Sequence, residues 1–433
     1  MITAIRFRRF RKIHLLFLMV LGISYITIAL NNRRATQQPC VDVLIRGPNG
    51  NGQPIDRLEE EAFLATIKVQ GRTPNGSAVL VGREYFEYLT SHLREAPYPG
   101  VDMYTQYVVN RLQLKPLRGV EALRPDFGPV LNDVKSFGYP IKISPCREDT
   151  DYQLPRLFVA VISAANYFEK RHMIRQTWLR QLRAQSDSGS SVHLVGFGFV
   201  VGRTHDRDLQ LKIESESSTY GDILQIDMVD VYNNLTLKVV GLLNFVSDHC
   251  SRIEFVLKVD DDVYVNARNL VSVVKNLDPA ESSVYGTATP TKVPREGKFA
   301  LSRDVWPWSH FPFYFMGAAV LIPAHTIEPL LAASQTTPYF LFEDVYVIGL
   351  CTSKAGIRVR VSESFLGEHA KLVPRPCYVQ DFITWLTKSA EHFNNSHWAT
   401  ENFYKNVTPC VFKGFDGTRE TSDPMQIIEF SFD

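Results

Sequence analysis

The feature that most constrains the fold is an apolar segment that ends in three consecutive aspartates, FVLKVDDDVYVN at residues 255–266. Carboxylates at the end of a buried strand are costly unless a cation neutralises them. Oxygen ligands of this kind suit Mg²⁺ or Mn²⁺, which commonly bridge protein carboxylates to nucleotide phosphates. A solvated acidic turn is the alternative, whereas the ligand spacing of an EF-hand loop does not follow Asp260. The run therefore predicts a metal site at the end of a strand.

The sequence around the aspartates alternates between buried-strand and helical patterns. Apolar runs predict strands at residues 157–164, 192–201, 223–228 and 253–259, and helical spacing appears at 169–182 and 235–246. Such alternation predicts an α/β fold with a mainly parallel sheet flanked by helices. Ligands of these folds bind beyond the carboxyl ends of the strands, where the aspartates lie. The chain has no GxGxxG, GxxxxGK[ST], GxSxG or HExxH motif, so NAD, P-loop and common hydrolase chemistries are not supported.

The N-terminal residues have the pattern of a membrane anchor. Basic residues in 1–12 precede an uncharged stretch at 13–30, and more of them lie before this stretch than just after it. The stretch is at the short end of what spans a bilayer, about 20 residues, and the charge bias predicts a lumenal body. A cleaved signal peptide is the alternative. We expect a cytoplasmic tail at 1–12, an anchor helix at 13–30, a stem and accessory segment at 31–150, a catalytic domain at 151–390 and a C-terminal extension at 391–433.

Composition agrees with a folded body in an oxidising compartment. The net charge of +1 argues against electrostatic capture of nucleic acid. The six cysteines are an even number without CxxC spacing, so disulfides are favoured over zinc, and the pairing stays open. Four glycosylation sequons begin at Asn75, Asn234, Asn394 and Asn406.

Several basic residues are candidates for binding phosphate. Arg171 and Arg175 are four residues apart on one helix face near the end of the first strand, where guanidinium groups could pair with a diphosphate or stack on a base. Lys238 and Lys258 could serve in the same way. The alternative for the arginines is a solvated helix face. A phosphate-binding role is therefore favoured only because the aspartates are nearby.

Two later segments carry candidate residues. Gly317, in the aromatic segment FPFYFMGAAVLIP at 311–323, would allow a ligand close to the backbone; a glycine in a buried strand is the alternative. Glu343 and Asp344 begin a predicted helix that ends near Gly356. The helix dipole favours their ionised forms, and an ionised carboxylate in a cleft can accept a proton from a hydroxyl. Helix capping is the alternative.

Six collinear segments together point to one family. They are RHMIRQTW from Arg171, YGDILQIDMVDVYNNLTLK from Tyr220, KVDDDVYVN from Lys258, YGTATPTKVPREGKFA from Tyr285, FPFYFMGAAVL from Phe311 and EDVYVIGLC from Glu343. In this order they resemble the beta-1,3-glycosyltransferases of the Golgi, which include galactosyl- and N-acetylglucosaminyltransferases. The resemblance covers about residues 154–356.

The resemblance implies a GT-A-type nucleotide-diphospho-sugar transferase fold and a single-pass type II Golgi membrane protein. It also implies inverting transfer of a sugar from a UDP-sugar to a hydroxyl of an acceptor glycan on a glycoprotein or glycolipid. Homo-oligomers, or hetero-oligomers with other Golgi transferases, are compatible with the family. We expect galactose as the donor sugar. The alternatives are N-acetylglucosamine or N-acetylgalactosamine as donor, or a silent relative that binds glycans without turnover.

The resemblance also implies roles for individual residues. Asp260, Asp261 and Asp262 would form the DxD element, with Asp262 as the ligand of Mn²⁺ (or Mg²⁺) and Asp260 on the ribose or metal side of UDP. Asp344 would be the general base. His369 is the nearest candidate for a late metal ligand, and an ordinary surface histidine is the alternative.

Overall fold

The computed structural model describes Leu93 and residues 96–146, 154–188, 192–367, 371–413, 418–423 and 430–433. All of them belong to the second of two units, residues 45–433. The predicted anchor at 13–30, the sequon at Asn75 and the candidate ligand His369 lie outside the described residues. Among the residues described, the structure contains no helix with the length and apolar character needed to cross a membrane.

A seven-stranded sheet organises this unit, in the order β3-β2-β1-β4-β7-β6-β8. β1 pairs in parallel with β2 and β4, β2 with β3, and β6 with β8, whereas β7 runs antiparallel between β4 and β6. The predicted mainly parallel sheet is therefore confirmed, and the reversed strand is an addition that periodicity did not reveal. The strands are β1 (Arg156–Ile162), β2 (His193–Arg203), β3 (Ile223–Val229), β4 (Phe255–Asp260), β6 (Ser283–Ala288), β7 (Phe315–Pro323) and β8 (Arg358–Val361).

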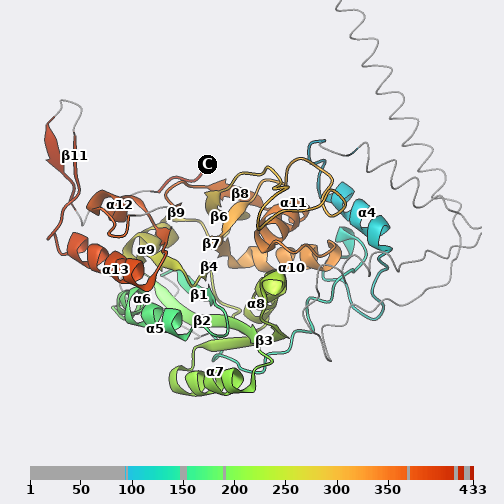
Figure 1. Ribbon diagram of the computed structural model, residues 1–433, viewed down its shortest axis with the longest axis horizontal. Coiled ribbons are helices and arrows are strands. Elements are labelled where there is room, and N and C mark those ends of the chain that lie inside the picture. The colour runs from blue at the N-terminus through green and yellow to red at the C-terminus, as the bar shows by residue number, and fades with distance from the viewer. Residues whose placement is uncertain are drawn as a thin grey trace, which may run out of the picture. The chain divides into compact units, whose positions relative to one another are not determined.

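Helices cover both faces of the sheet because its central strands are apolar on both. Leu157, Val159 and Val161 of β1 belong to one core cluster, and Phe158 and its alternate neighbours belong to the other. The first cluster packs under α5 (Phe168–Gln176), α6 (Trp178–Asp187), α7 (Arg207–Tyr220), α9 (Ala267–Asn276) and α13 (Ala390–Tyr404). The second packs under α8 (Leu235–His249), α10 (Ile327–Thr336) and α11 (Thr352–Ala355), which Figure 1 shows on the other side of the sheet from α6, α9 and α13.

Part of the segment expected as stem belongs to the folded body. Helix α4 (Val101–Leu112) contributes Tyr104 to the core, where its ring lies 5.2 Å from that of Trp306. The chain then passes through η1 (Pro125–Phe127), and Leu131 and Asn132 donate backbone hydrogen bonds to the carbonyl of Gln335 at 2.8 and 3.0 Å. The folded body therefore includes residues 96–146, which belong to the segment expected as stem and accessory segment.

A smaller C-terminal layer continues from the aspartate turn. The strand order β5-β10-β9 joins β5 (Val263–Val265), β10 (Thr384–Leu386) and β9 (Leu366–Gly367). Phe393 and Phe403 of α13, the helix that begins at Ala390, pack into the main core. The remaining elements are η2 (Tyr232–Asn234), η3 (Ala324–Thr326), α12 (Pro376–Asp381), β11 (Val411–Lys413) and β12 (Arg419–Thr421).

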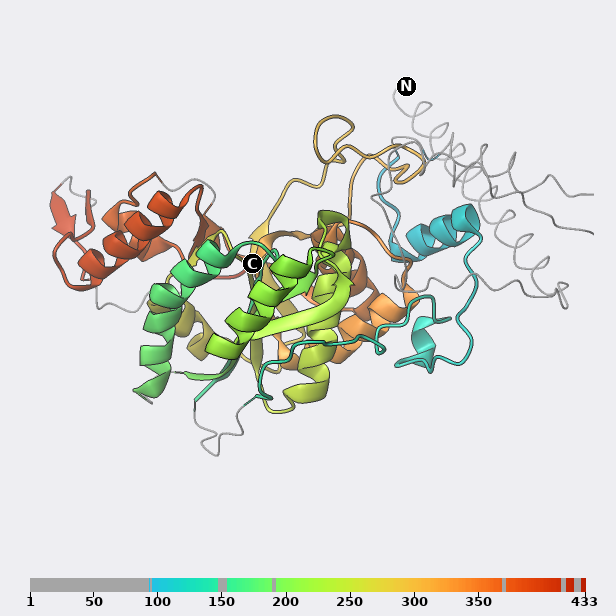
Figure 2. The same ribbon diagram turned by 60° about the horizontal axis from the view of Figure 1, so that its bottom comes forward.

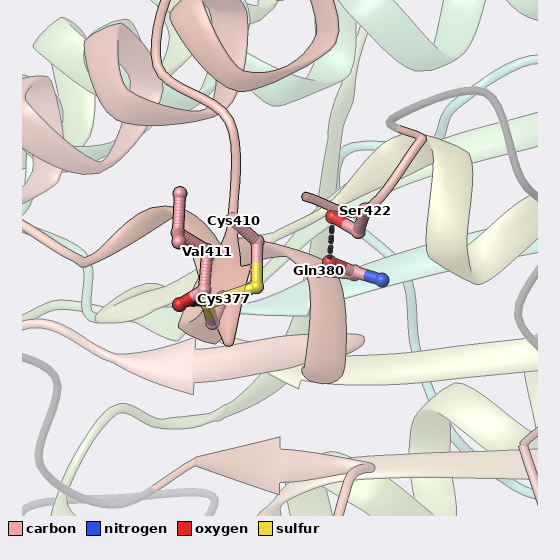
Figure 3. The surroundings of a disulfide bond; sticks show 5 residues. All are labelled: Cys377, Gln380, Cys410, Val411 and Ser422. Carbon is pink, nitrogen blue, oxygen red and sulfur yellow. Dashed lines mark hydrogen bonds between the residues drawn. A yellow bond between two sulfur atoms is a disulfide. The ribbon is translucent and has the colours of Figure 1, made fainter. Parts of the chain in front are cut away.

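Two disulfides confirm the expectation drawn from the cysteine count. Cys146 pairs with Cys250, which fastens the N-terminal part of the body to the end of α8, and Cys377 pairs with Cys410. Figure 3 shows the second bond between α12 and the start of β11, beside the hydrogen bond that the Ser422 hydroxyl donates to Gln380 at 2.6 Å. The cysteine at 351 is buried and unpaired.

Candidate active site

The three aspartates lie where β4 ends, as the apolar pattern predicts. Asp260 is the last residue of β4, and Asp261 and Asp262 form the turn into β5. The carbonyl of Asp262 accepts hydrogen bonds from the Thr387 amide at 2.8 Å and the Thr387 hydroxyl at 2.7 Å. These bonds fix the turn from the side of β10, so the carboxylates stand on a supported backbone.

Lys258 joins the aspartate turn to the segment that carries Asp344. Its ammonium group lies 3.0 Å from an Asp260 oxygen and 3.4 Å from a Glu343 oxygen, and it donates to the carbonyl of Gly317. The lysine side chain is only 2% exposed. Residues from β4, β7 and the segment at 343–344 therefore meet at the end of the sheet where β4 ends. The order of the sequence alone does not specify this meeting.

Gly317 is required by its neighbours within the protein. A Cβ at this position would lie 2.7 Å from a Glu343 oxygen and 3.0 Å from the Cβ of Asp344. Its amide also donates to the Asp344 carboxylate, and its carbonyl accepts from Lys258. We expected the missing side chain to admit a ligand; in the structure it admits the two acidic residues.

Glu343 and Asp344 begin a helix that ends at Gly356, whose φ of 67° is left-handed, as predicted. The stretch η4 (Val345–Cys351) is a π-helix, a form frequent at functional sites. Asp344 accepts a hydrogen bond from the Val345 amide at 2.8 Å. Asp344 therefore caps the helix and also borders the aspartate turn. The two interpretations of this residue, a helix cap and a proton acceptor, are compatible.

Burial controls the protonation of this acidic group. Burial raises the pKa of Glu343 to about 7, while Lys258 opposes the shift. Burial also raises the pKa of Asp344, against the hydrogen bonds from the amides of Val345 and Gly317. Burial raises the pKa of Asp260 to about 6, and Lys258 opposes this shift. The side chain of Asp260 nevertheless stays 32% exposed. A carboxylate with a raised pKa is a stronger base once it is ionised.

Asp261 faces a loop of the first strand instead of the open edge. Its carboxylate accepts hydrogen bonds from the Ser163 hydroxyl at 2.8 Å and the Lys170 ammonium at 2.6 Å. Because the side chain is buried with both oxygens engaged, Asp261 attaches the turn between β4 and β5 to the loop between β1 and α5. In this structure it positions the turn, and Asp260 and Asp262 are left as the more accessible carboxylates.

Arg171 and Arg175 stabilise the loop between β1 and α5 and the acidic residues packed behind it. Arg171 is fully buried and donates to Glu216 at 2.7 Å, to the Ser163 hydroxyl at 3.2 Å and to the Ala164 carbonyl at 2.7 Å. Arg175 pairs with Glu216 at 2.8 Å and with Asp222 at 2.7 Å. The expected diphosphate contacts are replaced here by contacts within the fold, so these arginines are positioning residues behind the aspartate turn.

Lys238 completes the support of this loop. Its ammonium lies 2.5 Å from an Asp230 oxygen and donates to the Ser163 carbonyl at 2.9 Å. The other Asp230 oxygen accepts from the amides of Ala165 and Gly202, each at 3.0 Å. The loop at 163–165 is thus held rigid at the end of β1, beside the end of β4, where ligands bind in open α/β sheets.

Asp260 and Asp262, the two more accessible carboxylates, are the side chains of the turn that could hold a divalent ion. No cluster of three or more His, Cys, Asp or Glu side chains suited to a metal occurs among the described residues. Mg²⁺ and Mn²⁺ at nucleotide sites commonly take one or two carboxylates and complete their shell with phosphates and water. Asp260 and Asp262 fit that chemistry.

The part of the chain that carries the site is similar to known proteins. Residues 169–363 match the galactosyltransferase family model. A mouse acetylgalactosaminyl-O-glycosyl-glycoprotein beta-1,3-N-acetylglucosaminyltransferase is 31% identical over 204 residues, which cover 46% of this chain and 52% of the relative. Over this region the chain is similar to beta-1,3-glycosyltransferases. Lactosylceramide 1,3-N-acetyl-beta-D-glucosaminyltransferases are 28% identical over 221 residues in Xenopus tropicalis and 27% over 274 residues in Homo sapiens.

The matches to this family are partial in length. The aligned segments cover 50% of this chain and 58% of the frog enzyme, and 60% of this chain and 69% of the human enzyme. A solved structure of the WbbM bifunctional glycosyltransferase aligns with a TM-score of 0.32 at 10% identity, over 60% of this chain and 53% of that one, which is too weak to bear on the fold.

The sequence alone does not identify every residue of this candidate site. Asp230, Glu216 and Lys170 become important only through tertiary contacts, and no local pattern distinguishes them from solvated charges. The sequence pattern indicates Lys258 only as a candidate phosphate ligand. An interior lysine in an apolar strand next to an acidic run was the available signal, because burial of such a charge requires a partner.

Proposed function

We propose that the chain is a UDP-sugar-dependent, inverting beta-1,3-glycosyltransferase. The observation that carries this proposal is the joint position of the aspartate turn and Asp344, which Lys258 connects through its contacts with Asp260, Gly317 and Glu343. An acidic metal site and a buried carboxylate at one sheet edge are the two groups that a direct displacement of UDP requires.

The residues divide the chemistry between them. Asp344 would accept the proton of the acceptor hydroxyl, and its amide bonds from Gly317 and Val345 fix the direction of the carboxylate. Asp260 and Asp262 would hold Mn²⁺, which when bound neutralises charge that develops on the UDP leaving group. Lys258 holds the two acidic segments together and balances their charge.

The proposal also names the donor sugar to be tested first. The sequence prediction favours galactose, with N-acetylglucosamine as an alternative. The relatives reported above are named N-acetylglucosaminyltransferases, which supports the alternative. We therefore propose UDP-N-acetylglucosamine as the first donor to test, followed by UDP-galactose and UDP-N-acetylgalactosamine, with a glycan of a glycoprotein or glycolipid as acceptor.

The location belongs to the same proposal. We place the protein in the Golgi membrane with a type II anchor at 13–30 and a lumenal body. The basic residues before this stretch and the two disulfides of the body support the assignment, because disulfides persist in the secretory pathway.

Purified full-length protein in detergent would be assayed for UDP release and sugar transfer with each donor, with and without Mn²⁺. The wild type should transfer one sugar in beta-1,3 linkage, and Asp262→Ala and Asp344→Asn should lower kcat by about 10²-fold or more. The matched control is Asp126→Asn, an aspartate whose side chain is 65% exposed. UDP binding without turnover on any acceptor would instead indicate a silent glycan-binding relative.

A further inference from the structure

We infer that Tyr232 and Phe299 form a stacking platform for the acceptor sugar, a galactose-configured pyranoside. This inference rests on the proposed function, since it gives the substrate class for the hydroxyl that Asp344 would deprotonate. The platform joins η2, which leads into α8, to the long connection between β6 and β7, the loop that extends from the sheet in Figure 2.

The two rings are exposed although they are large and apolar. Tyr232 is 54% exposed and Phe299 is 43% exposed, and their centroids are 6.3 Å apart at an interplanar angle of 42°. The Lys298 ammonium lies 5.1 Å from the Tyr232 centroid and 5.0 Å from the Phe299 centroid. A tilted aromatic pair with a cation beside it offers both ring surface and hydrogen-bond donors to one ligand.

Hydrogen bonds connect the platform to the segment that carries the base. The Tyr339 hydroxyl donates to the Asn233 carbonyl at 2.5 Å, and the Thr236 hydroxyl donates to the Phe340 carbonyl at 2.8 Å. The segment before Glu343 and Asp344 is thus attached to η2 and to the first turn of α8.

An aromatic contact adds a second connection from the other side of the platform. The Phe299 ring meets Phe342 edge to face at 6.0 Å, and Phe342 directly precedes Glu343 in the chain. The pKa of Tyr232 is raised by burial and then by the charges of Asp344 and Asp260, which is consistent with this proximity. The platform therefore borders both acidic segments.

The chemistry of pyranosides favours a galactose-configured sugar on such a surface. With its axial O4, a galactoside presents the C–H groups of C3, C4 and C5 together on one ring face, while its O3 is equatorial at the ring edge. Stacking that face on aromatic rings leaves O3 free to approach a neighbouring carboxylate. Glucosides have an equatorial O4 and lack this combined apolar patch.

The test uses methyl β-D-galactopyranoside and methyl β-D-glucopyranoside as probes. Phe299→Leu and Tyr232→Leu preserve apolar packing but remove the ring faces, so the acceptor KM for the galactoside should rise about tenfold with kcat nearly unchanged. Hydrolysis of the UDP-sugar without acceptor should keep its donor KM. Phe299→Trp should retain acceptor binding, and Trp398→Leu, an exposed aromatic on α13 at 58%, is the matched control.

Saturation-transfer NMR with the same probes separates this inference from the proposed function. Galactoside signals that weaken in both leucine variants would support the platform, even if the wild type transferred no sugar. An unchanged galactoside signal in both variants, equal binding of the glucoside, or a rise in donor KM that matches the rise in acceptor KM would overturn it.

Discussion

Replacement of Lys258 by methionine should destabilise the protein strongly at alkaline pH. The lysine is 2% exposed and its ammonium contacts Asp260 at 3.0 Å and Glu343 at 3.4 Å. Removal of one partner from a buried ion pair leaves an uncompensated charge and costs about 3–5 kcal/mol. We expect a loss of this size in the free energy of unfolding at pH 8, where Glu343 is ionised.

The loss should shrink at lower pH. Burial raises the pKa of Glu343 from an ordinary 4.5 to about 7, so the folded state binds more protons than the unfolded state between these values. Stability therefore falls as pH rises through this window. At pH 5.5, below this pKa, Glu343 is mostly neutral with or without the ammonium of Lys258, so part of the deficit disappears.

Urea unfolding followed by circular dichroism at pH 8 and pH 5.5 measures both effects. Lys258→Met/Glu343→Gln should recover stability at pH 8, which also covers the case in which the single variant does not fold. Lys354→Met is the matched control, since this lysine donates to the Thr336 carbonyl at 2.9 Å. A loss below about 1 kcal/mol at pH 8, or an equal loss at both pH values, would refute the role assigned to the buried lysine.

Three further outcomes are expected. Gly317→Ala places a Cβ 3.0 Å from that of Asp344, so kcat should fall about 10²-fold in the transfer assay with little change in donor KM; an unchanged kcat would contradict the close packing. Loss of the disulfide between Cys146 and Cys250, which are 104 residues apart, should lower the free energy of chemical unfolding by about 4.7 kcal/mol. Loss of the disulfide between Cys377 and Cys410, which are 33 residues apart, should lower it by about 3.7 kcal/mol. A larger effect of the second disulfide would argue against loop entropy as the cause. Phe432→Ala removes a partly buried ring that packs on a core tyrosine at 5.0 Å and should cost about 1–2 kcal/mol; a thermal midpoint equal to that of the wild type would exclude this contact as a source of stability.

The sheet and the position of the acidic turn could be predicted because they depend on local patterns. The run at 157–164 is apolar without alternation, which a strand covered on both faces requires, and β1 is buried on both faces. The helix expected at 169–182 is broken at Thr177, where α5 ends and α6 begins, because periodicity reports which residues are buried and gives little information on where the backbone changes direction.

The partners of charged residues could not be predicted in the same way. Arg171 and Arg175 share a helix face, as their spacing requires, but that spacing does not say whether the face meets a nucleotide or Glu216 and Asp222. Their partners lie 45 and 47 residues away in the chain, so only the folded structure decides between the two.

The sequence by itself determined a buried sheet whose central strand ends in acidic residues, because hydrophobic period and strand length are properties of contiguous residues. Tertiary structure decided which acids are paired and which remain accessible. Asp261 is held by Ser163 and Lys170, whereas Asp344 is brought to the aspartate turn through Lys258 and Gly317. That selection depends on burial and on contacts between segments 59 to 98 residues apart, and the energy of a buried charge is set by those contacts.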